Sequence, residues 1–156
     1  MNTFLNQEEA TFYHITTIEN WEGIKINGFH SKEGKIFVSR VGELPILLAI
    51  ALEQLPEIYD TETIVFLKFP QKLNNFTSKE IIQDKQAGVE WTQPFQNIIL
   101  RKNIPIENIE IMNMIDIGNN DEIRTSRMTW LTQIANSGQN NYKNHCILQR
   151  AKEIKY

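Results

Sequence analysis

The sequence predicts an α+β fold in a single domain, residues 1–156. Runs of β-branched and aromatic residues alternate with segments whose apolar residues recur at helical spacing, so both kinds of element are expected. Their order is strand, helix, strand, helix, several strands and then two helices, which is not the regular alternation of a doubly wound sheet. A chain of 156 residues suits one core, and no loose linker divides it.

The first elements are a strand, a helix and a second strand. Residues 11–16 are rich in aromatic and β-branched residues and predict the first strand. A helix is expected over residues 17–28, because Thr17 can cap its first turn and Gly28 is well placed just after its last turn. Residues 35–39 predict the next strand.

The middle and end of the chain continue this mixture. Residues 43–55 are apolar on most sides and predict a buried helix, whereas residues 62–69 predict a central strand covered on both faces. Residues 77–87 are compatible with a short helix or with a loop. The remaining expected elements are strands at residues 89–92, 97–101 and 109–115 and helices at residues 121–138 and 141–155.

Composition and charge are those of an ordinary soluble protein, with 41% hydrophobic and 22% charged residues. No apolar run approaches the roughly 20 residues of a membrane span, and no secretory signal is recognisable, so no membrane partner is expected. The single cysteine, Cys146, excludes an internal disulfide and fits a cytoplasmic location. A net charge of −3 argues against broad nucleic-acid binding but leaves room for a local basic patch.

The motifs of several enzyme classes are missing, including the phosphate-binding loop, the dinucleotide-binding glycine motif and the zinc-protease motif. His145 and Cys146 are neighbours that would point in different directions on a helix. No Cys/His pairing accompanies them, so no metal site is expected.

His14 is the residue most suggestive of a binding site. Side chains alternate along a strand, so His14 and Thr16 are expected on one face, near the start of the next helix. A helix N-terminus offers unpaired N–H groups and partial positive charge, which suit a ribose or phosphate oxygen. A purely structural histidine is the alternative interpretation.

Residues 13–29, YHITTIENWEGIKINGF, followed by residues 34–39, GKIFVS, resemble the opening of the ADP-ribosyltransferase superfamily. The likeness is to the branch of diphtheria toxin and the poly-ADP-ribose polymerases, and it is closer to bacterial toxins with a His-x-Thr motif that modify DNA. Residues 88–92 and 103–109 are similar to a later segment of those toxins. The resemblance implies a split, strongly bent β core with flanking helices and a cleft for NAD.

The resemblance implies roles for three neighbouring residues of the first motif. His14 would hydrogen-bond a ribose hydroxyl of NAD, and Ile15 would hold the nicotinamide carboxamide through its backbone. Thr16 would help to fix the strand and the following loop. The family usually has glycine where this chain has Ile15, so the isoleucine side chain must find room elsewhere.

The second and third motifs are also implied by the resemblance. Phe37 would stack on the nicotinamide ring, and Ser39 occupies the small-residue position that follows. Glu90 would be the catalytic glutamate, stabilising the oxocarbenium-like transition state. Glu80 and Glu107 lie on either side of Glu90 and are its rivals for this role. The helix after Phe37 has no second stacking tyrosine.

The implied activity is transfer of ADP-ribose from NAD to a macromolecular acceptor, protein or nucleic acid, with release of nicotinamide. Two alternatives remain: a fold relative that binds without catalysis, and an enzyme similar to RNA 2′-phosphotransferases. The scarcity of arginine near His14 and Phe37 counts against the second alternative. A further hypothesis is a patch of aromatic and basic side chains that faces the substrate and consists of Trp91, Phe95, Arg101 and Lys102. The alternative interpretation is the ordinary flank of a partly exposed strand.

Overall fold

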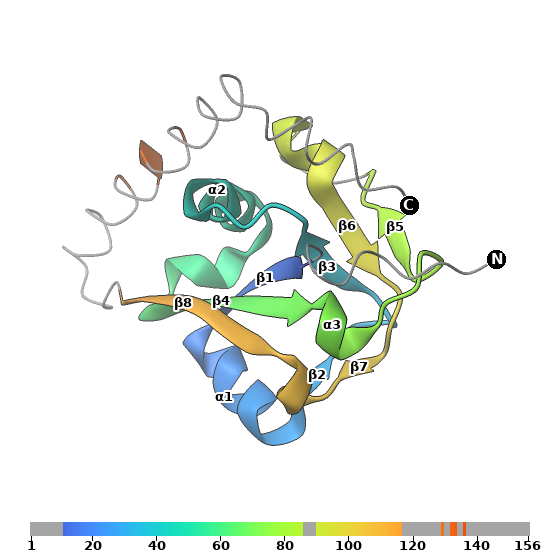
Figure 1. Ribbon diagram of the computed structural model, residues 1–156. Coiled ribbons are helices and arrows are strands. Elements are labelled where there is room, and N and C mark those ends of the chain that lie inside the picture. Colours follow the sequence, from blue (N-terminus) through green and yellow to red (C-terminus); the bar gives the residue numbers. More distant parts are fainter. Residues whose placement is uncertain (1–10, 86–89, 117–128, 130–131, 134–135, 137–156) are drawn as a thin grey trace.

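The computed structural model describes residues 11–85 and 90–116 and a few isolated positions after residue 128 (Figure 1). The helices predicted at residues 121–138 and 141–155 therefore lie outside the described residues, apart from those isolated positions. No helix in the described part of the chain is both long and apolar enough to cross a membrane.

A six-stranded sheet with the strand order β5-β6-β3-β1-β4-β8 forms the centre of the fold, and its neighbouring strands are antiparallel. A separate pair of short strands, β2 and β7, lies beside it (Figure 1). The bounds are β1 Thr11–Thr17, β2 Phe29–His30, β3 Ile36–Ser39, β4 Thr63–Pro70, β5 Ile81–Gln83, β6 Gln96–Ile99, β7 Asn103–Ile104 and β8 Glu110–Asp116.

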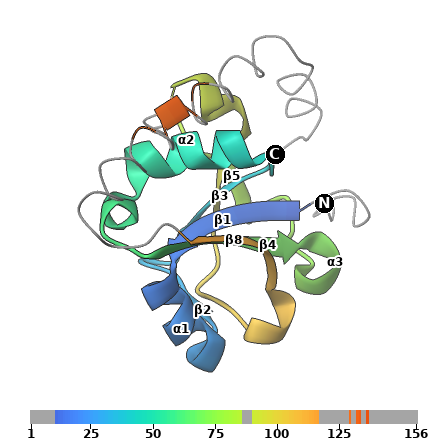
Figure 2. The same ribbon diagram turned by 90° about the vertical axis from the view of Figure 1, so that its left-hand side faces the viewer.

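Helices cover both faces of this sheet, with α1 on one side and α2 on the other (Figure 2). The predicted α+β class is therefore confirmed. The α-helices of the described part are α1 Ile18–Asn27, α2 Leu44–Gln54 and α3 Gln71–Asn74, and the 3₁₀ helices are η1 Pro56–Tyr59, η2 Glu90–Phe95 and η3 Ile106–Asn108.

Strand β4 shows why the sheet has two covered faces. Ile64 and Phe66 pack against α2, whereas Val65 and Leu67 pack in the core on the α1 side. All four side chains are fully buried. Successive side chains of a strand point to opposite faces, so a strand buried on both faces needs a continuous apolar run. The prediction of a central strand here is confirmed.

Helix α1 begins and ends where its sequence predicts. The Thr17 hydroxyl oxygen accepts a hydrogen bond from the Asn20 N–H at 3.2 Å. At the other end, the Gly28 N–H donates to the Ile24 carbonyl at 2.8 Å, and Gly28 has a positive φ of 77°. These caps fix the direction of the chain immediately after β1, the strand that carries His14.

The segment before β6 differs from its prediction. Residues 89–92 were expected as a strand, but Glu90–Phe95 form a 3₁₀ helix, so that expectation is wrong. Pro94 has no N–H to donate to a sheet ladder, and the turn lets the fully buried Phe95 ring pack under α2 beside Ile46 and Ile50. The described part of the segment at residues 77–87, residues 77–85, contains a turn followed by β5 rather than a helix.

Two glycines provide a matched test of local packing. A Cβ at Gly42 would lie 2.6 Å from Cε1 of Tyr13, whereas one at Gly23, inside α1, would meet nothing within 4 Å. We expect Gly42→Ala to lower the free energy of unfolding by about 1–3 kcal/mol, because the Tyr13 ring must move. Gly23→Ala should raise it by about 0.5–1 kcal/mol. Urea denaturation of both variants measures these changes, and equal effects would contradict the packing at Gly42.

Candidate functional site

The central strands β1 and β3 separate immediately after they meet. Strand β1 pairs with β4 along all seven of its residues, but its pairing with β3 consists of Tyr13 opposite Ser39. Strand β3 pairs along its whole length with β6 instead. We call the opening between residues 14–17 of β1 and residues 36–38 of β3 the fork.

His14 lies at the closed end of the fork. Its Nδ1 is 2.8 Å from the carbonyl oxygen of Phe37, so the imidazole joins the two strands just beyond their last backbone pair. The Phe29 ring meets the imidazole edge-on at a centroid distance of 4.9 Å. The Phe69 ring lies nearly parallel to it at 6.0 Å. These contacts, made by residues far apart in the chain, hold the imidazole in one orientation.

The hydrogen bond determines which ring nitrogen is free to bind. Burial lowers the pKa of His14 below its ordinary value, and the hydrogen bond to the Phe37 carbonyl offsets only part of this effect. The imidazole is therefore neutral at pH 7. A carbonyl can only accept, so Nδ1 carries the proton and Nε2 keeps its lone pair. Within the described residues Nε2 has no partner, which makes it an acceptor for a hydroxyl or amide donor.

The Phe37 side chain does not join the imidazole. Ile36 and Val38 are buried in the core on the α1 side, which also contains Phe69. Alternation along β3 therefore turns the Phe37 ring to the opposite face, where it is 49% exposed. His14 and Phe37 meet through the backbone carbonyl of Phe37, and their rings lie on different faces of the sheet.

The other residues of the first two motifs shape the strands around the fork. Thr16 and Ser39 are both buried, and Ile15 is half-buried against the core on the α2 side. The Ser39 hydroxyl donates to the Val41 carbonyl at 2.8 Å and accepts from the Val41 N–H at 3.0 Å. This closed turn directs the chain from β3 towards α2.

The three candidate glutamates occupy different places. The backbone of Glu90 begins η2, a few residues before β6, and its side chain lies outside the described part of the structure. Glu107 is exposed on η3. Glu80 is held by Arg101 in a two-pronged ion pair, with Nε to Oε2 at 2.8 Å and Nη2 to Oε1 at 2.9 Å. The Glu80 carboxylate is therefore part of a structural ion pair with Arg101.

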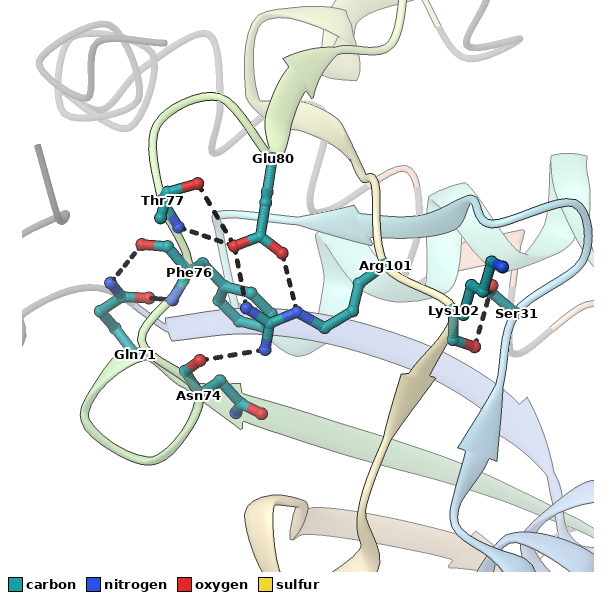
Figure 3. Close-up of polar contacts among 8 residues, drawn as sticks. All are labelled: Ser31, Gln71, Asn74, Phe76, Thr77, Glu80, Arg101 and Lys102. Carbon is teal, nitrogen blue, oxygen red and sulfur yellow. Dashed lines mark hydrogen bonds and ion pairs between the residues drawn. The ribbon is translucent and has the colours of Figure 1, made fainter. Parts of the chain in front are cut away.

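Arg101 and Glu80 belong to a cluster that joins two loops (Figure 3). The Arg101 guanidinium lies 4.4 Å from the centre of the Phe76 ring and donates to the Asn74 carbonyl at 3.0 Å. The Thr77 N–H donates to Glu80 at 2.9 Å. The cluster ties the turn after α3 to the end of β6.

The contacts of Arg101 in this cluster argue against the predicted substrate-facing patch of aromatic and basic side chains. Arg101 is paired with Glu80, and Phe95 is fully buried under α2. Lys102 is exposed, and the Trp91 side chain lies outside the described residues. Arg101 and Phe95 therefore belong to the framework of the protein rather than to an exposed patch.

The Glu80 ion pair makes stability depend on pH. Burial would raise the pKa of Glu80, but hydrogen bonds from Arg101 and the Thr77 N–H outweigh it and hold that pKa below its ordinary value of 4.5. The contribution to stability is therefore full above pH 4.5 and disappears as the pH falls through the lowered pKa. We expect the stability difference between the wild type and Glu80→Gln to shrink as the pH is lowered from 7 to 3. Urea denaturation at several pH values measures it, and a constant difference would contradict the assignment.

Asn97 was not singled out from the sequence. It is fully buried on β6, and its Nδ2 donates to the Ile82 carbonyl at 3.0 Å. Its Oδ1 has no hydrogen-bond partner among the described residues. Register places it opposite Val38, on the face that His14 also occupies. The available signal was a pair of side-chain amides, Gln96 and Asn97, directly before the apolar residues of β6.

Among the described residues, no group of three or more His, Cys, Asp or Glu side chains is arranged to hold a metal ion. Comparison of the chain with family models, with curated proteins and with solved structures found no match.

Proposed function

We propose that the chain is an NAD-dependent ADP-ribosyltransferase that moves ADP-ribose from NAD to a macromolecular acceptor. The observation that carries the proposal is His14, a neutral imidazole fixed at the fork with Nε2 available as a hydrogen-bond acceptor. A ribose hydroxyl is a suitable donor for that lone pair. The resemblance of residues 13–39 to the superfamily assigns the same partner to His14.

The reaction breaks the bond between ribose C1′ and the pyridinium nitrogen of NAD. Nicotinamide leaves with the bonding pair and becomes neutral, and C1′ forms a new bond to an oxygen or nitrogen of the acceptor, whose proton passes to solvent. Positive charge develops on the ribose between these events, so a fixed carboxylate lowers the barrier. Glu90 is the proposed carboxylate, and the resemblance supports this role.

The fork also suggests how NAD would lie. The ring of Phe37 and the imidazole of His14 are on opposite faces of the sheet, so NAD bound at His14 would lie against the Phe37 backbone and not against its ring. Ile15 follows His14 on β1, where its backbone could hold the nicotinamide carboxamide. Thr16 and Ser39 are both buried, and the resemblance assigns Thr16 the role of fixing the strand and the following loop.

Binding of NAD is the first test. At a concentration 100 times its dissociation constant, NAD should raise the free energy of unfolding by about 2.7 kcal/mol. We expect His14→Ala to remove most of this gain, because it removes the acceptor at Nε2. The matched control is His30→Ala, since His30 is an exposed histidine hydrogen-bonded to Asn103 on β7. Urea denaturation with and without NAD measures the gain, and equal gains in both variants would contradict the role of His14.

A second candidate is an NAD-binding module without catalysis. It is favoured by the direction of the Phe37 ring, which does not share a face with His14. The two candidates differ in one measurable product. Stabilisation by NAD together with nicotinamide release supports the enzyme, and stabilisation without release supports the module.

A further inference from the structure

A buried side-chain hydrogen bond joins η2, the segment that begins at Glu90, to the sheet. Gln96 is the first residue of β6, and its Nε2 donates to Oγ1 of Thr92 in η2. Both side chains are buried, that of Thr92 completely. Thr92 follows Glu90 by two positions, so the two residues lie within one turn of the same 3₁₀ helix.

The burial of this bond indicates a specific role. A hydroxyl or an amide taken out of water costs free energy, and the hydrogen bond that compensates it contributes a net stabilisation of only about 1 kcal/mol. Apolar side chains would fill the same space without that cost. A hydrogen-bonded polar pair instead fixes one arrangement of the segments it joins. The bond between Gln96 and Thr92 therefore determines where η2 lies relative to β6.

Pro94 explains why η2 needs a side-chain tie. It lies between Thr92 and Gln96 and has no N–H, so its backbone cannot donate a hydrogen bond where η2 passes into β6. The bond from Gln96 to Thr92 spans this point. Arg40 adds a second tie, because its Nη2 donates to the Pro94 carbonyl and its N–H donates to the Phe95 carbonyl at 2.9 Å. The tie at Thr92 is nearer in the chain to the proposed catalytic carboxylate.

The register of the sheet connects the same tie to His14. Gln96 stands opposite Ser39 of β3, and Ser39 stands opposite Tyr13 of β1, the residue next to His14. Backbone pairing along this row fixes the position of Gln96 relative to His14. His14 and η2 are thus attached to one row of three strands, the first directly on β1 and the second through the side chain of Gln96.

We propose that Gln96 and Thr92 are positioning residues, which hold η2 so that the carboxylate of Glu90 keeps its place relative to NAD bound at His14. This inference rests on the proposed function. A displacement of about 1 Å at a reacting group costs about 10²-fold in rate, so loss of the bond should slow the reaction. The bond acts through Glu90 and not through NAD, so binding of NAD should persist.

Thr92→Val tests the inference, because valine keeps the shape of threonine and removes the hydroxyl that accepts from Gln96. We expect kcat for nicotinamide release from NAD to fall about 10- to 100-fold, with KM and the NAD-induced gain in stability little changed. Thr92→Ser keeps the hydroxyl and should retain most of the wild-type kcat. Unchanged kcat in folded Thr92→Val, or an equal loss in Thr92→Ser, would overturn the inference.

Gln96→Met and Gln71→Met form a matched pair of variants. Gln71 is also a buried glutamine, but its Nε2 donates to the Phe76 carbonyl at 2.7 Å, in the turn after α3. Both variants should lose stability in urea denaturation, because each removes a buried hydrogen bond. Only Gln96→Met should lower kcat. Equal kcat values in the two variants would give the bond a purely structural role and overturn the inference.

A double variant separates this inference from the proposed function. In a Glu90→Gln background, Thr92→Val should cause no further loss of kcat, because the carboxylate that the bond positions is already absent. The same fold loss in both backgrounds would overturn the inference and leave the role of Glu90 intact. A wild-type protein that releases no nicotinamide would overturn the proposed function and this inference with it.

Discussion

Replacing Glu90 by glutamine is expected to lower the rate of nicotinamide release by roughly 10²- to 10³-fold, the usual effect of removing one preorganised electrostatic contact from a transition state. Glutamine keeps the shape and hydrogen-bonding capacity of the side chain but loses its negative charge. That charge is what would stabilise the developing sugar cation. The NAD-induced gain in stability should remain, because ground-state binding does not need it.

Chromatography of the nicotinamide released from NAD measures this effect, and thermal unfolding checks that the variant is folded. Glu107→Gln is the matched control, since Glu107 is an exposed glutamate on η3. Unchanged turnover in Glu90→Gln would remove Glu90 from the mechanism. A wild-type protein that binds NAD and releases no nicotinamide would favour the binding module instead.

Replacing Phe69 by alanine is expected to lower the free energy of unfolding by about 3–5 kcal/mol, the usual cost of removing a buried aromatic ring. The Phe69 side chain is fully buried, its ring lies beside those of His14 and Phe29, and its strand position is opposite Phe12. The free energy of unfolding of a typical domain is about 5–15 kcal/mol, so such a loss is a large share of it.

Phe66→Ala is the control for this change, because Phe66 is equally buried on the same strand but faces α2. Urea denaturation should give similar losses for the two variants. Only Phe69→Ala should move the pKa of His14 back towards its ordinary value of 6.5, since it lets water reach the imidazole. An NMR titration measures that pKa, and Phe69→Leu serves if the alanine variant does not fold. Equal shifts in the Phe66 and Phe69 variants would contradict the assigned environment of His14.

The sequence by itself determined the elements whose signals are local. Thr17 and Gly28 mark the ends of α1 because capping joins groups only three or four residues apart. The apolar run of β4 predicted a strand covered on both faces for a similar reason, since alternation depends on immediate neighbours. The same local logic singled out His14 near the junction of β1 and α1.

Only the tertiary structure decided how these elements meet. His14 and Phe37 are 23 positions apart, and their hydrogen bond depends on the place where β1 and β3 separate. The face taken by the Phe37 ring depends on strand register, and a shift of one residue would reverse it. Residues 90–95 form a 3₁₀ helix because Phe95 packs under α2, a contact with distant residues. Pairing between distant strands leaves no local pattern in the chain, which is why periodicity predicted the strands but not the fork between them.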